Sequence, residues 1–172
     1  MKRGNVASQQ GKRTAEPSSP GKSRTWWHPL LVNLLRHELG GAYDVLGEVN
    51  VGVIPMRLDV VLLRRAHGRL SAAVRRELAT LVKILNKNTF IEFKAPTDRL
   101  EHGDLDYLCG CVRMYRSQQR KVLAARDITQ VILAPKLTAA FQRDVTANDW
   151  KLSQVSRGVH RVMGPETFAT WV

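Results

Sequence analysis

Two short apolar stretches of this chain carry charged residues, and this combination limits how the chain can fold. The first stretch, residues 56–64, contains Asp59, and the second, residues 88–94, contains Glu92 and Lys94. In both stretches the residues are either continuously apolar or alternate between apolar and polar, and turn residues lie on either side. This pattern predicts two neighbouring strands of one sheet. Because side chains alternate along a strand, Glu92 and Lys94 should share the face that lines a cleft, while their apolar neighbours anchor the other face in the core.

Basic residues outnumber acidic ones, with 27 Lys and Arg against 15 Asp and Glu, a formal charge of +12 and a pI near 10.4. Such a balance favours polyanions, because bound Lys and Arg release counterions from phosphates. At 172 residues and 44% hydrophobic content, the chain can form one domain with a sizeable core. We expect nucleic acid as the partner, although the charge alone would also suit a basic protein that binds no nucleic acid. The sequence leaves open whether the chain forms a homo-oligomer.

The only cysteines, Cys109 and Cys111, have no second cysteine pair or histidine cluster near them in the sequence. A four-ligand zinc site is therefore not expected. On a helix the two side chains would point in different directions, so we expect no disulfide and a reducing, cytoplasmic location. The sequence has no run of about 18 apolar residues and no apolar signal core at its N-terminus, which predicts a soluble protein with no membrane partner.

Residues 1–25 differ in composition from the rest of the chain. They contain six basic residues and one acid, Glu16, and no aromatic residue. Because such a segment buries little apolar surface, we predict a disordered basic tail, followed by a single domain over residues 26–172. The tail could be merely solvated or could act as a non-specific phosphate-binding arm.

The domain is expected to be α/β, with a mixed central sheet flanked by helices. Leucines at helical spacing predict a first helix that ends at Gly40-Gly41, and a hairpin of strands follows over 43–53 and 56–64. Residues 66–80 predict a loop or a short helical insertion. The remaining pattern predicts a strand (90–93), a helix (104–116), a strand (128–133) that completes a βαβ crossover, a helix (138–145) and a peripheral hairpin (151–155, 159–163).

Asp59, Glu92 and Lys94 together suit magnesium chemistry on phosphates. Mg²⁺ takes oxygen ligands and keeps several waters, so two carboxylates and a substrate phosphate can hold it. A lysine beside the metal can orient a water or stabilise a developing oxyanion. As an accessory carboxylate we consider Glu38, on the first helix, with Glu48 on the next strand as its rival.

This order of elements and these residues resemble the PD-(D/E)xK nuclease superfamily, whose restriction-endonuclease-like core is αβββαβ. The resemblance covers residues 29–134, and the segment from Phe90 to Tyr115 is similar to an uncharacterised bacterial branch akin to transposase-like nucleases. It implies metal positions at Asp59 and Glu92 and a catalytic lysine at Lys94. It also implies that Glu38 is the helix glutamate.

The resemblance implies a Mg²⁺-dependent nuclease, with Mn²⁺ as a substitute, that hydrolyses phosphodiester bonds of nucleic acid. We expect DNA as the substrate and leave RNA open. An inactive nuclease-fold module for nucleic-acid or protein binding is the alternative. Phosphate contacts are expected from basic and tyrosine side chains, namely Arg64, Arg65, Arg75, Arg76, Tyr107 and Arg113.

Overall fold

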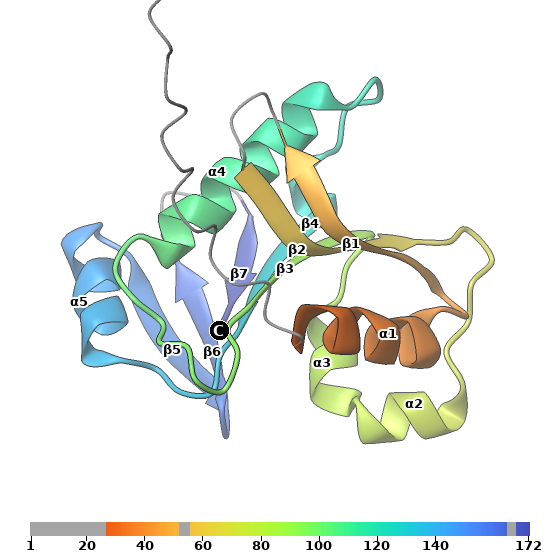
Figure 1. The fold of residues 1–172 in the computed structure, drawn as a ribbon, viewed down its shortest axis with the longest axis horizontal. Coiled ribbons are helices and arrows are strands. Elements are labelled where there is room, and N and C mark those ends of the chain that lie inside the picture. The colour runs from red at the N-terminus through yellow and green to blue at the C-terminus, as the bar shows by residue number, and fades with distance from the viewer. Residues whose placement is uncertain (1–26, 52–55, 165–167) are drawn as a thin grey trace, which may run out of the picture.

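The structure is a computed structural model, and it describes residues 27–51, 56–164 and 168–172. The predicted tail and the hairpin turn at 52–55 lie outside these residues. The chain begins with helix α1 and strands β1 and β2, continues through two short helices, and then forms a βαβ unit and a C-terminal group of one helix and three strands (Figure 1). In chain order the elements are α1 (Trp27–Leu39), β1 (Tyr43–Val51), β2 (Met56–Arg64), α2 (Ala72–Glu77), α3 (Ala79–Ile84), β3 (Asn88–Phe93), α4 (Asp104–Gln118), β4 (Ile128–Leu133), α5 (Ala139–Ala147), β5 (Lys151–Ser156), β6 (Val159–Met163) and β7 (Ala169–Trp171).

The strands form one seven-stranded mixed sheet in the order β1-β2-β3-β4-β7-β6-β5. The first three strands pair antiparallel, and β4 then lies parallel to β3, as α4 crosses over between them. On the far side of β4, β7 is parallel to it, while β6 and β5 continue antiparallel. The expected α/β class, with a mixed sheet flanked by helices, is thereby confirmed.

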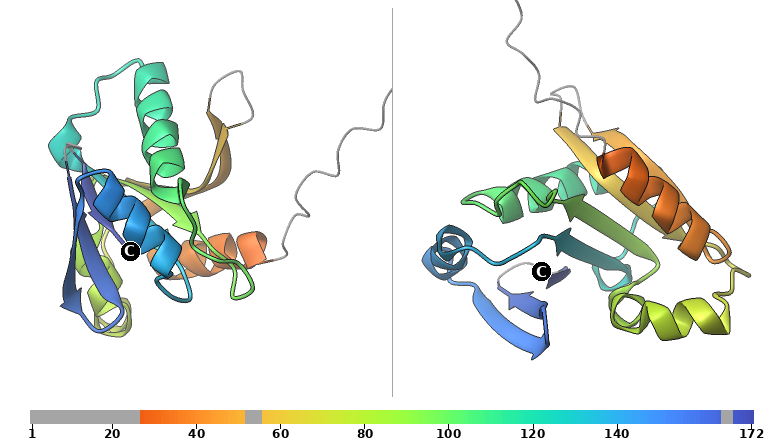
Figure 2. Two further views of the ribbon diagram at one scale, coloured as in Figure 1. Left: turned by 90° about the vertical axis from the view of Figure 1, so that its left-hand side faces the viewer. Right: turned by 60° about the horizontal axis from the view of Figure 1, so that its bottom comes forward.

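Helices cover the two faces of the sheet and bury two separate apolar clusters. On one face, Phe90 and Val61 pack with the apolar side of α4 and with Phe141 of α5. On the other face, Val60 and Ile91 pack with buried side chains of α1. The left view of Figure 2 shows β3 between α4 and α1. The strand residues therefore alternate between two cores, and a charged residue in β2 or β3 must lie at the edge of one of them.

Helix α1 lies on β1 because small and branched residues allow a close approach. A Cβ atom added to Gly47 of β1 would come within 2.8 Å of a Val32 methyl group, closer than real atoms pack. Leu35 and Leu39, one turn apart, are buried below the helix. Helix α1 is consequently held close against β1.

Most predicted elements are confirmed, and the differences have simple physical causes. Of the two alternatives for residues 66–80, the helical insertion is present, as the two short helices α2 and α3, and α3 continues to Ile84. Neither helix has a fully buried residue, which explains the weak apolar periodicity. Strand β7 was not predicted, because three residues are too few to show a period. As β7 joins the C-terminal hairpin to β4, the prediction of a peripheral hairpin is wrong: β5 and β6 extend the central sheet. None of the helices within the described ranges is both long and apolar enough to span a membrane.

Candidate functional site

Asp59 and Glu92 occupy facing positions on β2 and β3. Val60 pairs with Ile91 in this antiparallel ladder, so the next residues, Asp59 and Glu92, come opposite each other. Asp59 bends toward the end of β3, where its Oδ2 accepts the backbone N–H of Phe93 at 2.9 Å. The ladder thus brings together two carboxylates that are 33 positions apart in the sequence.

Lys94 joins these carboxylates from the residue that follows β3. Its Nζ lies 3.4 Å from Glu92 Oε1 and 2.6 Å from Oδ1 of Asp104, the first residue of α4. Asp104 is fixed in turn, because its Oδ2 accepts the N–H of Glu101 at 2.7 Å. Lys94 therefore bridges the strand carboxylate and the beginning of the helix.

The four side chains of Asp59, Glu92, Lys94 and Asp104 are largely buried, with exposed fractions of 12% to 19%. The sequence predicted that Glu92 and Lys94 share the face that lines a cleft. The structure instead encloses them between the sheet and the beginning of α4. A substrate would therefore reach them only at their exposed edges.

His28 contacts the site from helix α1, which packs on the other face of the sheet from α4. It lies in the first turn of α1, where its Nε2 is 3.4 Å from Asp59 Oδ2 and its ring meets the Phe93 ring edge-on, 5.9 Å between centroids. No motif in the sequence singles out His28. Its side chain is only 18% exposed.

Tyr107 lies one turn after Asp104 and reaches the beginning of β2. Its hydroxyl accepts the N–H of Arg57 at 3.0 Å and donates to the carbonyl of Arg57 at 3.1 Å. The thiol of Cys111, one turn further along α4, lies 3.9 Å from the same carbonyl. Burial raises the pKa of the Cys111 thiol, so it stays protonated and unreactive at neutral pH. Tyr107 is therefore tied to the beginning of β2, and its contact with phosphate stays a prediction.

Burial and crowding of negative charge control the ionisation of the site. Burial, and then the neighbouring charge of Asp59, raise the pKa of Glu92 from 4.5 to about 7, although Lys94 opposes this shift. Burial alone would lower the pKa of Lys94, but the hydrogen bond to Asp104 and the charges of Glu92 and Asp104 outweigh it and raise that pKa. Lys94 is consequently an ammonium ion at neutral pH, while Glu92 is only partly ionised.

The residues present fit a magnesium ion. Asp59 and Glu92 supply the hard oxygen donors that Mg²⁺ prefers. After burial, the charge of Asp59 is the next cause of the raised pKa of Glu92, and a divalent cation between the two carboxylates would offset this repulsion. Within the described ranges there is no group of three or more acidic, histidine or cysteine side chains suited to a metal. The ion would depend on two carboxylates, water and substrate oxygens.

Of the two candidates for an accessory carboxylate, the structure places Glu48 nearer to Asp59. Gly47 pairs with Val60 and Val49 with Leu58, so Glu48 occupies the position opposite Asp59. Its φ of +52° is uncommon for a residue with a side chain, and its Oε2 lies 3.8 Å from Arg57.

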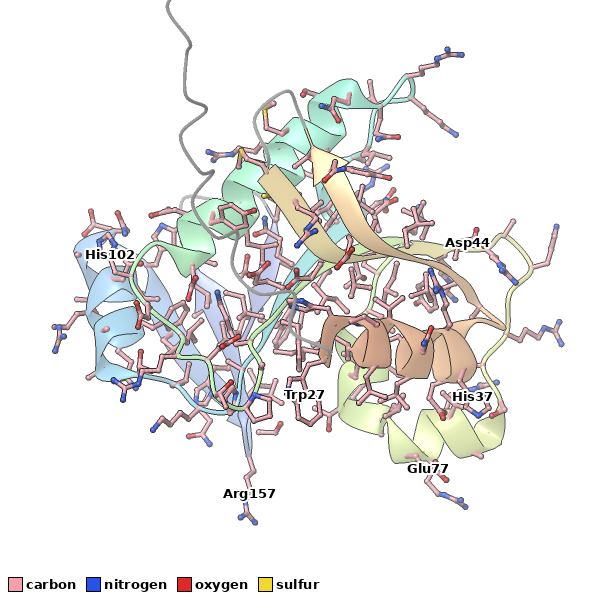
Figure 3. All side chains as sticks on the ribbon, in the orientation of Figure 1. Trp27, His37, Asp44, Glu77, His102 and Arg157 are labelled. Carbon is pink, nitrogen blue, oxygen red and sulfur yellow. The ribbon has the colours of Figure 1, made fainter. Side chains whose placement is uncertain are left out.

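Glu38 is ten residues along α1 from His28, about 15 Å at the rise of a helix. Its carboxylate lies 3.8 Å from the imidazole of His37. Trp27, beside His28, and His37 mark the two ends of α1 in Figure 3. The structure therefore does not bring Glu38 to Asp59.

Three of the predicted phosphate contacts also lie away from the site. Arg64 and Arg65 are at the far end of β2, at least five residues and about 17 Å from Asp59, and Arg65 pairs with Asp44 at 2.8 Å. Arg113 is exposed on α4, nine residues and about 14 Å beyond Asp104.

Sequence reasoning missed Asp104 and His28 as members of the site. An acid in the first turn of a helix is common, because it complements the helix dipole. The sequence therefore gave no indication that Asp104 also pairs with Lys94. His28 follows two tryptophans in the sequence and has no partner at metal-ligand spacing. Only the packing of α1 and α4 against the sheet shows that both residues face the same pair of strands.

Comparisons of this chain with models of protein families, with curated proteins and with solved structures find no match. The geometry of the site is therefore the basis for the function proposed below.

Proposed function

We propose that this protein is a metal-dependent nuclease of the PD-(D/E)xK type, which hydrolyses phosphodiester bonds of nucleic acid, with DNA as the expected substrate. One observation carries the proposal: Asp59 and Glu92 face each other on adjacent strands, and the ammonium of Lys94 lies 3.4 Å from Glu92. Such a group on the strand ends next to a helix is suited to a cation and a phosphate.

The arrangement of elements supports the same proposal. Apart from the short helices α2 and α3, the elements from α1 to β4 follow in the order helix, three antiparallel strands, helix and a strand parallel to the third, which agrees with the αβββαβ order that the resemblance implies. The two helices α2 and α3 lie between the second and third strands. They account for the 33-residue interval between Asp59 and Glu92 without separating β2 from β3 in space.

Each side chain has a role that follows from its charge and position. Lys94 carries a positive charge that can stabilise a developing oxyanion or orient a water by donating a hydrogen bond, and it is too strongly protonated to act as a base. Asp104 fixes the direction of that ammonium. Asp59 and Glu92 would hold Mg²⁺ or Mn²⁺, and such an ion supplies positive charge beside a phosphate and acidifies water.

Cleavage assays test this function. Purified protein is incubated with plasmid, single-stranded DNA and RNA, with Mg²⁺, Mn²⁺ or a chelator. We expect cleavage that requires metal and that falls roughly 100-fold or more in Asp59→Asn and Lys94→Ala, since each substitution removes charge at the reacting phosphate.

The matched control for the acidic substitution is Glu77→Gln, because Glu77 is an exposed carboxylate on α2. This variant should cleave like the original protein. Cleavage that persists in chelator, or that survives both site substitutions, would contradict the proposal. Binding of nucleic acid without cleavage would instead support the inactive nuclease-fold module.

A further inference from the structure

Three exposed cations lie at the end of the sheet that carries the site. Arg99 is in the connection from β3 to α4, Lys136 is in the connection from β4 to α5, and Arg157 is in the β5–β6 turn. We call Arg99, Lys136 and Arg157 the strand-end cations. They come from three separate connections, so their shared location is a property of the topology and is invisible in the sequence.

The hydrogen-bonded registers place them at this end. Glu92 pairs with Ile132 of β4, and one residue beyond the Val131–Trp171 pair, Val172 exchanges backbone hydrogen bonds of 2.7 and 2.8 Å with His160. One row of the sheet therefore runs from Glu92 to the beginning of β6. The β5–β6 turn lies just beyond this row, and Figure 3 shows Arg157 projecting from its tip.

The sheet also sets the span between the site and the hairpin. From β3 to β5 there are four strand spacings, in the order β3-β4-β7-β6-β5. At 4.7 to 4.9 Å each, they amount to about 19 Å. A single phosphate group cannot extend over this span. A ligand that contacts both ends must be extended and must carry several charges.

The surface beside two of the strand-end cations is hollowed. A cavity of about 480 Å³ lies where the β3–α4 connection meets the beginning of α5, and it is lined by Arg99, Lys136, Glu101 and the first residues of the helix. Thr138 fixes one wall, because its hydroxyl donates to the carbonyl of Leu100. Two of the strand-end cations thus border a recess that is open to a ligand.

We propose that the strand-end cations contact successive backbone phosphates of the DNA that enters the site, an inference that rests on the proposed function. Ligands of α/β sheets bind beyond the carboxyl ends of parallel strands, and β3, β4 and β7 all end here. Phosphate contacts from Arg and Lys fix the register of a nucleic acid without reading its sequence. The strand-end cations, rather than Arg64 and Arg65 at the opposite end of β2, then guide the backbone to Lys94.

Binding in chelator tests this surface separately from cleavage. The full chain is titrated against fluorescein-labelled single-stranded and duplex DNA in EDTA, over a range of salt concentrations, by fluorescence anisotropy. We expect the triple variant Arg99→Ala, Lys136→Ala, Arg157→Ala to bind more than tenfold more weakly at low salt. The slope of log K against log salt should fall in magnitude by roughly two to three, about 0.7 to 0.9 for each phosphate that a cation no longer neutralises.

A second triple variant is the matched control: Arg69→Ala, Arg120→Ala, Lys121→Ala removes three exposed cations elsewhere, also two arginines and one lysine, and makes the same change in net charge. It should change affinity less than twofold. A third variant that keeps the charge, Arg99→Lys, Lys136→Arg, Arg157→Lys, should keep the original slope, which separates loss of charge from loss of folding.

Equal weakening by both alanine triples, no change in the first triple, or no binding by the original protein would overturn the proposal. Metal-free binding that weakens as expected in a protein that does not cleave would leave this surface standing and remove only the nuclease activity.

Discussion

Glu92 is a largely buried carboxylate that has charged neighbours of both signs. Its carboxylate has the neighbouring charge of Asp59 on one side and the ammonium of Lys94 on the other, and burial raises its pKa to about 7. A carboxylate of this kind destabilises the folded chain when it ionises, and a cation bound beside it would stabilise the ionised form. The pH at which Glu92 ionises therefore reports the burial and charge of the site in the absence of substrate.

The stability of the Glu92→Gln variant should depend on pH in a defined way. Because the folded-state pKa of Glu92 is raised, the folded chain keeps a proton that the unfolded chain loses, and the original protein loses stability as pH rises from about 4.5 to about 7. The shift corresponds to about 3 kcal/mol. Gln does not titrate, so in urea unfolding with EDTA the variant should gain up to this amount relative to the original protein between pH 4.5 and 8. The exposed control Glu77→Gln should show no trend, and a constant offset for Glu92→Gln would contradict the pKa.

At the scale of elements, helix α5 supports the site although it follows β4 in the chain and contributes no site residue. Asp144 of α5 is buried and accepts the N–H of Gly103 at 2.8 Å, and it also faces His102 at 3.2 Å. Gly103 has a φ of +82° and immediately precedes Asp104, which holds Lys94. The helix thus fixes the turn that sets the position of Lys94.

Asp144→Ala should destabilise the fold by about 2 kcal/mol, because it leaves the N–H of Gly103 without its acceptor. The same substitution should lower cleavage while Lys94 is still present, since the turn before α4 loosens. Urea unfolding and the cleavage assay measure the two effects. Gln142→Ala, an exposed substitution on the same helix, is the control and should change neither. A stability loss with cleavage unchanged would show that α5 has no influence on the site.

Element prediction from the sequence succeeded where residues of one kind recur over a full strand or several helical turns. The buried residues of α4, including Leu105, Leu108 and Val112, recur at helical spacing, and the helix was predicted within two residues. Strand β4 is almost wholly buried and was predicted with its observed bounds. For residues 66–80 the sequence left a loop and a short helical insertion open, and the structure shows the helical alternative as α2 and α3. The three-residue β7 was missed, because three residues are too few to show a period.

At the scale of the whole molecule, a strongly basic chain concentrates acidic side chains at one place. The formal charge is +12, yet Lys94 pairs with both Glu92 and Asp104, and Asp59 lies opposite Glu92. A basic surface attracts polyanions, and an acidic site attracts a cation, so the distribution of charge suits both partners of a metal-dependent nuclease. Ions that bind only the folded chain should then stabilise the molecule as a whole.

Magnesium or manganese should raise the melting temperature. At ten times the dissociation constant the gain is about 1.4 kcal/mol, or about 3 to 5 °C for a chain of this size. The shift should be larger at pH 8 than at pH 6, because Glu92 must lose its proton to bind the ion. Differential scanning fluorimetry with and without metal measures it. Asp59→Asn and Glu92→Gln should abolish the shift and Glu77→Gln should keep it, whereas no shift with either metal would count against the site.

The sequence by itself determined the α/β class, most strand and helix positions, and the residues Asp59, Glu92 and Lys94, because local periodicity and the alternation of side chains are written in neighbouring residues. Only the tertiary structure decided that His28 and Asp104 join them and that Glu38, Arg64 and Arg65 do not. It also decided that three connections place Arg99, Lys136 and Arg157 at one end of the sheet. These relations depend on strand order, register and the seating of α1 and α4, which are set by the packing of the whole core.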